Sequence, residues 1–196
     1  MIKGYQILRS SGMFILLAFL ATTLAMPIDH ASTCPFPNGT DKALHSYICA
    51  KGEQFSVNSI DTTDINGNMV YPIDPRKPFI LRLNAYNHGQ QIDDNKVNVR
   101  IFEYEAGLTS SACTWTQVPT FGLLNNIDGC DYAHNCPLTQ GPLTLDLPLD
   151  LTQFSAIINI LASYRPYEFE IRMFNWNKGN TKHEEIACVM AQVELI

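Results

Sequence analysis

The stretch "YEFEIRMFNWNKGNTKHEEIACVMAQVEL", residues 167–195, decides the fold class. In its first part, apolar and charged side chains alternate with a period of two, which is typical of a half-buried strand. The apolar side of this strand consists of Phe169, Ile171 and Met173. The last part, Glu185–Leu195, is apolar on both faces, and the turn-rich segment Asn177–His183 lies between the two parts. We therefore expect two antiparallel strands joined as a hairpin.

The same alternation recurs upstream and predicts further short strands. These segments are Glu53–Ile60, Pro78–Tyr86, Lys96–Glu105 and Pro142–Leu147. Several short strands separated by turn residues are typical of a sandwich or a barrel. The sequence contains no internal repeat and no linker rich in proline and glycine, so we expect one all-β domain.

One stretch breaks this rhythm. Residues 151–164 carry apolar side chains at helical spacing, Asp150 can cap the start of a helix, and Pro166 can end it. The stretch predicts one short helical insert between two strands. We consider two roles for it: a lid over a pocket, or a connector that packs on the sandwich.

The first 25 residues have the layout of a secretory signal peptide. A basic start precedes an apolar run from Met13 to about Leu24, and small residues lie before the expected cleavage site after Ala25. A membrane anchor is the alternative, but the run is shorter than the ~20 residues that a spanning helix needs. We expect residues 26–196 to form the mature, secreted, extracellular protein, with the endosomal or lysosomal lumen as a further compartment.

Six cysteines follow this segment, and an even number in a secreted chain favours disulfides. They are Cys34, Cys49, Cys113, Cys130, Cys136 and Cys188. The stretch "GCDYAHNCPL" (129–138) also offers ligands for zinc, yet zinc sites usually combine two close Cys/His pairs, and this chain has one. We expect a disulfide-stapled loop, no metal and no cofactor. The sequon at Asn38 predicts glycosylation.

The charge of the chain excludes one class of partner. The formal net charge is −6, and no basic stripe is present, which argues against nucleic-acid binding. Signatures of enzymes are also missing: there is no Gly-x-Ser-x-Gly elbow, no His-Glu-x-x-His motif and no glycine-rich phosphate loop. We therefore expect that the protein is not an enzyme.

Several motifs in order resemble the ML lipid-recognition domain family, which includes the Niemann-Pick type C sterol carrier and the group 2 dust-mite allergens. The motifs are a cysteine after the signal peptide (Cys34), a Val-Pro-x-Phe-like strand (Val118, Pro119, Phe121), "CDYAHNCPL" and a final strand that contains Cys188. The resemblance implies an immunoglobulin-like β-sandwich of two antiparallel sheets, splayed to hold a lipid between them. It also implies the disulfides Cys34–Cys188 and Cys130–Cys136, which leaves Cys49 with Cys113.

The resemblance implies that the apolar sides of the strands line a lipid cavity. The candidate lipid-binding residues are Phe79, Leu81, Leu83, Val97, Val99, Ile101, Phe121, Leu143, Leu145, Leu147, Phe154, Ile158, Phe169, Ile171, Met173 and Val189. The same side chains would fill a dry sandwich core equally well, and the residues alone do not distinguish the two.

We therefore expect a non-enzymatic lipid-binding and transfer protein that holds a sterol, fatty acid, phospholipid or related lipid and contacts a membrane or a receptor during transfer. The alternative is an immunoglobulin-like recognition or receptor-accessory module that acts through protein–protein contacts.

Overall fold

The computed structural model describes residues 34–50, 53–107, 111–134, 136–161 and 164–196, so the expected signal peptide lies outside the described residues. All of these residues belong to one compact unit, Ala31–Ile196. The fold is an all-β sandwich of two antiparallel sheets, which confirms the expected fold class.

The larger sheet has the strand order β1-β9-β8-β4-β5, and the short β6 also pairs with β4. Its strands are β1 (His45–Ile48), β4 (Asn95–Ala106), β5 (Cys113–Val118), β6 (Ile127–Asp128), β8 (Arg165–Asn175) and β9 (Glu185–Leu195). The expected hairpin is present, because β8 and β9 pair antiparallel with Ile171 opposite Val189. The alternation of apolar residues had not indicated β1. The strand expected at Val118, Pro119 and Phe121 lies earlier in the chain, because β5 ends at Val118.

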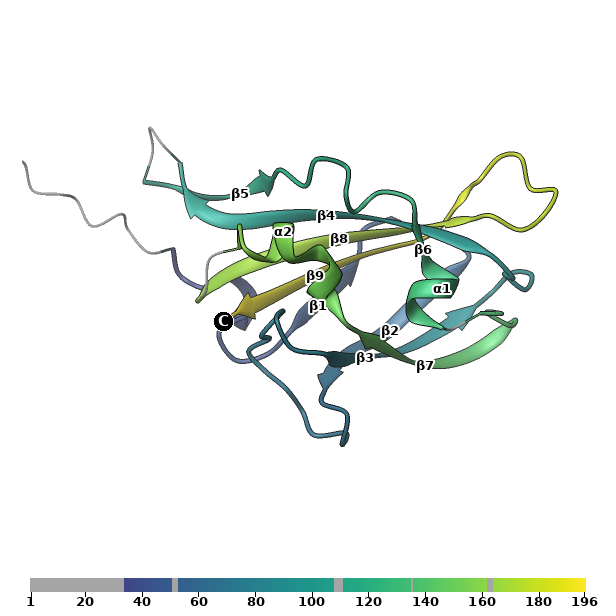
Figure 1. Ribbon diagram of the computed structural model, residues 1–196, viewed down its shortest axis with the longest axis horizontal. Helices are drawn as coiled ribbons and strands as arrows, with labels where there is room; N and C mark the ends of the chain where they lie inside the picture. The colour runs from purple at the N-terminus through teal and green to yellow at the C-terminus, as the bar shows by residue number, and fades with distance from the viewer. Residues whose placement is uncertain (1–33, 51–52, 108–110, 135, 162–163) are drawn as a thin grey trace, which may run out of the picture. The chain divides into compact units, whose positions relative to one another are not determined.

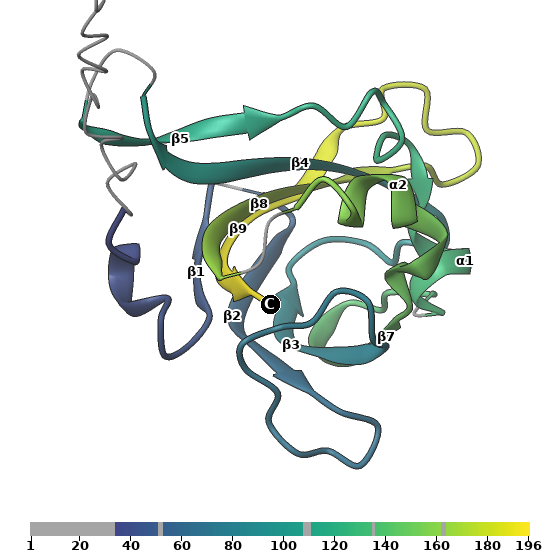
Figure 2. The same ribbon diagram turned by 60° about the vertical axis from the view of Figure 1, so that its left-hand side comes forward.

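The smaller sheet has the order β2-β3-β7, with β2 (Phe55–Thr63), β3 (Phe79–Asn87) and β7 (Gly141–Leu149). Figure 2 shows this sheet facing the larger one. The edge strand β7 carries Pro142 and Pro148, both exposed. Proline lacks a backbone N–H and is confined to edge strands, so these residues discourage a further strand from pairing here.

The sandwich has two separate clusters of buried apolar residues. The first core cluster is Ile73, Ile101, Val118, Leu124, Ile157, Tyr167, Val193 and Leu195. The second core cluster is Phe55, Ile92, Leu138, Ile186 and Ala187. Each is extended by half-buried neighbours from both sheets, such as Phe79 and Phe169 for the first and Leu145 and Met173 for the second.

Two of the three expected disulfides were wrong. The structure pairs Cys34 with Cys113 and Cys49 with Cys188, and only Cys130–Cys136 is as expected. The reason lies in the sheet. Strand β1 pairs with β9 with Ile48 opposite Val189, so Cys49 comes directly beside Cys188, and its N–H donates to the carbonyl of Cys188 at 3.1 Å. Cys34 instead joins the chain before β1 to the start of β5.

The helical insert is shorter than expected. The 3-10 helix η2 (Leu151–Phe154) runs into the single turn α2 (Ser155–Ile158), and Asp150 caps η2 as predicted by accepting from the N–H of Thr152. Ile157 is 2 % exposed and belongs to the first core cluster, and Phe154 and Leu161 pack against that cluster. The insert therefore packs on the sandwich as a connector does.

Candidate functional site

The inward side of the smaller sheet is a continuous apolar surface. Leu83 lies opposite Leu145, and Leu81 lies opposite Leu147, in the register of β3 and β7. Because side chains alternate along a strand, these four residues face the same way as Phe79 and Leu143, which contact the two core clusters. All four are only half-buried.

The larger sheet presents a matching apolar surface. Val97 lies opposite Met173, Val99 opposite Ile171, and Ile101 opposite Phe169. Ile101 and Val189 are buried, whereas the other members of this surface are half-buried. The structure thus brings together, on two facing surfaces, all the sequence-predicted lipid-binding residues of β3, β4, β7, β8 and β9.

Several side chains on the inward surfaces are not fully buried. In a closed sandwich the inner side chains interdigitate at about 10 Å between sheets and pack to the density of a crystal. Here Leu81, Leu83 and Leu147 retain solvent-accessible surface and belong to neither of the two core clusters. The two clusters have no member in common. The inward surfaces are therefore incompletely covered by protein.

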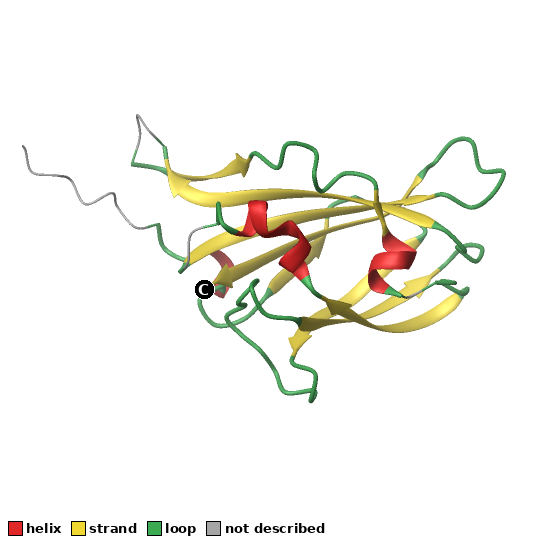
Figure 3. Ribbon diagram, in the orientation of Figure 1, coloured by secondary structure: helices red, strands yellow, loops and turns green. Residues whose placement is uncertain are grey.

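A groove of about 640 Å³ opens beside the edge strand β7, between the helix α1 (Gly129–Ala133) and η2. Figure 3 shows both helical segments, in red, on the same side of the sandwich and between the two sheets. The residues around the groove are Leu123, Asn125, Ile127, Asp128, Asp131, Tyr132, His134, Pro148, Asp150 and Phe154. Ile127 and Phe154 also pack against the first core cluster, so the groove reaches the inner packing of the sandwich.

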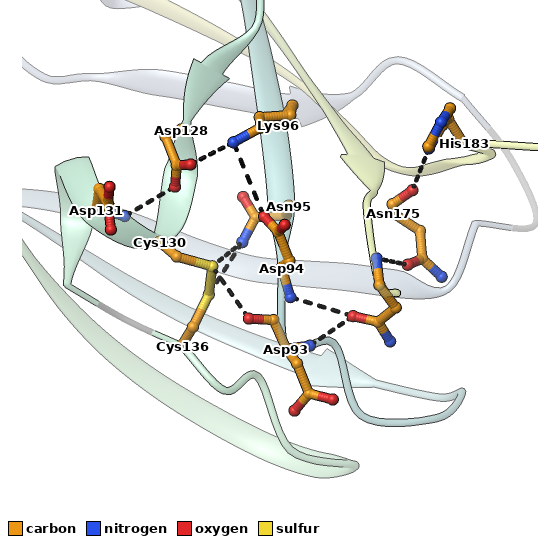
Figure 4. A network of polar contacts seen from close by, with 11 residues as sticks. Asp93, Asp94, Asn95, Lys96, Asp128, Cys130, Asp131, Cys136, Asn175 and His183 are labelled. Carbon is orange, nitrogen blue, oxygen red and sulfur yellow. Dashed lines mark hydrogen bonds and ion pairs between the residues drawn. A yellow bond between two sulfur atoms is a disulfide. The ribbon is translucent and has the colours of Figure 1, made fainter. Parts of the chain in front are cut away.

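One wall of the groove is the stapled stretch 129–136. Asp128 caps α1 by accepting from the N–H of Asp131, and the Cys130–Cys136 disulfide closes the loop. Asn95 Nδ2 lies 3.3 Å from Sγ of Cys130 and 3.2 Å from Sγ of Cys136 (Figure 4). A Cβ at Gly129 would come within 1.9 Å of Asn95 Oδ1, so only glycine allows this close approach. The wall is accordingly tied to β4.

The sulfur of Cys130 lies near the carboxylates of Asp94 and Asp128, with ligand atoms within 4.8 Å of one another. Metal binding by cysteine requires a thiolate, and a disulfide sulfur is not one. The stretch that could have bound zinc therefore acts as a structural staple, as the sequence predicted, and Asp131 and His134 are exposed on it.

The rim of the groove is acidic. A hydrogen bond from Lys96 is the main reason why the pKa of Asp128 lies below its usual value, and Lys96 also lies 3.9 Å from Asp94. The hydroxyl of Thr152 donates to Asp150 at 2.6 Å and is the main cause of the lowered pKa of Asp150. Both carboxyl groups are therefore ionised at neutral pH.

Three sequence-predicted lipid-binding residues lie elsewhere. Phe121 is 82 % exposed, with φ at 51°, in the turn after β5, so the expectation that it lines the space between the sheets was wrong. The reason is that β5 ends at Val118 and the chain turns away at Pro119. Phe154 lies at the groove rather than between the strands, and Ile158 is buried in the connector.

Sequence reasoning missed the groove itself. The rings of Tyr132 and Phe154, whose centroids lie 5.8 Å apart, form an aromatic wall of the groove. The hydroxyl of Tyr132 donates to the carbonyl of Asp150 at 2.9 Å and joins α1 to the start of η2. Tyr132 belongs to the stretch "GCDYAHNCPL", and an aromatic residue inside a disulfide-stapled loop was the sequence feature that could have indicated the groove.

Comparisons with known proteins add little to this geometry. No family model matches the chain, and no curated protein matches it. Among solved structures, the C-terminal domain of wzt is similar at a TM-score of 0.37 with 8 % identity, and the alignment covers 81 % of each chain. No described helix is long and apolar enough to cross a membrane.

Proposed function

We propose that the protein is a non-enzymatic lipid-binding and transfer protein of the ML type, with a lipid held between its two sheets. The observation that carries the proposal is the pair of facing apolar surfaces, half-buried at Leu81, Leu83 and Leu147, between two separate core clusters. Each methylene that a ligand buries there contributes roughly 0.8 kcal/mol. A chain of about a dozen methylenes would gain on the order of 10 kcal/mol before ordering costs.

One of the three observed disulfides supports the resemblance. The close pair Cys130–Cys136 bridges its own loop, as the resemblance implies. The last cysteine pairs with Cys49 and not with the first cysteine, Cys34, so the other two bridges depart from the expected pattern. Three disulfides and no free cysteine in the described residues also support an oxidising, secreted environment.

Organic extraction of the secreted protein, followed by mass spectrometry, tests the proposal directly. We expect a stoichiometric sterol, fatty acid or phospholipid, and binding of dehydroergosterol or a fluorescent fatty acid after delipidation. A clean protein that binds neither probe would contradict the proposal.

A matched pair of variants tests where the lipid binds. Leu83→Trp places a large ring on the inward surface and should reduce probe binding at least about tenfold, because it occupies the volume of the ligand. Thr144→Trp adds the same ring on the exposed side of β7 and should leave binding unchanged. Equal binding by both folded variants would exclude the space between the sheets as the site.

A further inference from the structure

The groove between α1 and η2 combines an apolar floor with a negatively charged rim. Ile127 and Phe154 form part of the floor and pack against the first core cluster, and Leu123 and Tyr132 extend the apolar surface. Its volume of about 640 Å³ is within the range of small-molecule sites. An amphiphile that reaches the inner surfaces from this side would leave its polar head at the rim.

The charges at this rim have one sign. Asp128, Asp131 and Asp150 line the groove, and its described lining contains no lysine or arginine. The ammonium group of Lys96 forms ion pairs with Asp128 and Asp94 (Figure 4). The carboxylates of Asp128, Asp131 and Asp150 carry three negative charges, and Lys96 compensates one of them. The rim therefore has a charge of −2.

Asp131 and Asp150 form no ion pair within 4.0 Å among the described residues, although Lys96 also attracts Asp131 at longer range. Asp150 accepts from the N–H and the hydroxyl of Thr152, which are neutral donors, so its charge is not compensated. Asp131 is exposed on α1, on the opposite side of the groove. A cationic head between these walls would be attracted by both, and an anionic head would be repelled by both.

We infer that the lipid ligand is a single-chain amphiphile with a cationic amine head, which lies at the rim between Asp131 and Asp150 while its chain enters the sandwich beside Ile127 and Phe154. This inference rests on the proposed function and specifies the head group of its ligand. Charge complementarity selects this occupant over fatty acids, which carry the wrong sign, and over alcohols, which gain no ionic attraction.

Competition with a fluorescent fatty-acid or sterol probe by three amphiphiles of equal chain length tests the inference. Dodecylamine, dodecanol and dodecanoate differ only in their heads. We expect the amine to bind about tenfold more tightly than the carboxylate, with the alcohol between them, since exposed charges interact only modestly through water. The preference should shrink when ionic strength rises from about 0.01 M to 1 M.

A matched set of variants separates the rim from the overall negative charge of the chain. The double variant Asp131→Asn/Asp150→Asn should abolish the preference for the amine, and asparagine at position 150 still caps η2. Glu184→Gln removes one charge on the exposed β8–β9 connection and should leave the preference unchanged.

The inference is overturned if the carboxylate or the alcohol competes as well as the amine, or if the preference persists in the double variant. Failure of the probe and of all three amphiphiles to bind would instead contradict the proposed function itself.

Discussion

The carboxylate of Glu53 accepts a hydrogen bond from the backbone N–H of Cys188, at the disulfide that joins the end of β1 to β9. Burial is the main reason why the pKa of Glu53 rises from 4.5 to about 7, and a hydrogen bond with Glu185 adds to it. Glu185 in turn accepts from Arg172 at 2.7 Å. The protonated form of Glu53 is thus favoured at the junction of β1 and β9.

Stability should therefore depend on pH through Glu53. Between pH 4.5 and about 7 the folded chain holds a proton that the unfolded chain releases, so the free energy of unfolding falls as pH rises through this window and levels off above it. After solvent screening, we expect a loss on the order of 1 kcal/mol. Urea denaturation at pH 5 and pH 8 measures it.

The variant Glu53→Gln should flatten this dependence, because glutamine keeps an acceptor for the N–H of Cys188 and can donate to Glu185 at every pH. Glu105→Gln, on β4, is the control and should retain the pH dependence of the original chain. An unchanged slope in Glu53→Gln would show that other groups cause it.

The disulfide pairing gives a second prediction. Non-reducing peptide mapping should find Cys34 linked to Cys113 and Cys49 linked to Cys188. Replacing Cys49 and Cys188 by alanine should cost about 2–5 kcal/mol, because the bridge closes a long loop in the unfolded chain. Replacing Cys34 and Cys113, which are closer in sequence (79 against 139 residues), should cost slightly less. A peptide that links Cys34 to Cys188 would contradict the structure.

The alternation of apolar residues predicted the longer strands β2, β3, β4, β7, β8 and β9, but it could not have predicted the disulfides. Period-two patterns such as Val97, Val99 and Ile101 report which side of a strand is apolar, and that side does face the other sheet. Disulfide pairing depends on which strands become neighbours. Nothing in the spacing of Cys34 and Cys49 indicates that β1 lies beside β9.

The candidate site was predictable only in its inner part. The inward residues follow from periodicity, whereas the groove depends on how the chain turns between strands. The position of Phe121 depends on where β5 ends, and the wall at Tyr132 depends on α1 and η2 lying on the same side of the sandwich. The helical pattern of residues 151–164 correctly predicted a helical insert between two strands but overestimated the length of the helix.

The connector gives a third prediction, which concerns stability. Ile157→Ala should lower the free energy of unfolding by about 2–5 kcal/mol, since it leaves a cavity in the first core cluster. Ile160 is 49 % exposed, and Ile160→Ala should change stability by less than about 0.5 kcal/mol. Chemical denaturation of both variants measures the difference. Equal effects would show that the connector does not belong to the core.

The exposed turn after β5 gives a prediction about transfer. Phe121 is largely exposed, and the next apolar residue, Leu123, is exposed and lines the groove. Exposed apolar side chains beside a binding site mark surfaces that contact membranes or partners. We expect Phe121→Asn to slow lipid transfer between vesicles several-fold while leaving the affinity for a soluble probe unchanged.

The choice of asparagine keeps this test clean, because the φ of 51° at position 121 is one that asparagine tolerates better than most residues. Ile65→Asn is the matched control, since Ile65 is 81 % exposed in the turn between β2 and β3 and does not line the groove. It should leave the transfer rate as it is. If both variants slow transfer equally, the loss reflects overall surface hydrophobicity. If Phe121→Asn transfers lipid at the original rate, the turn after β5 is not the part of the protein that contacts the membrane.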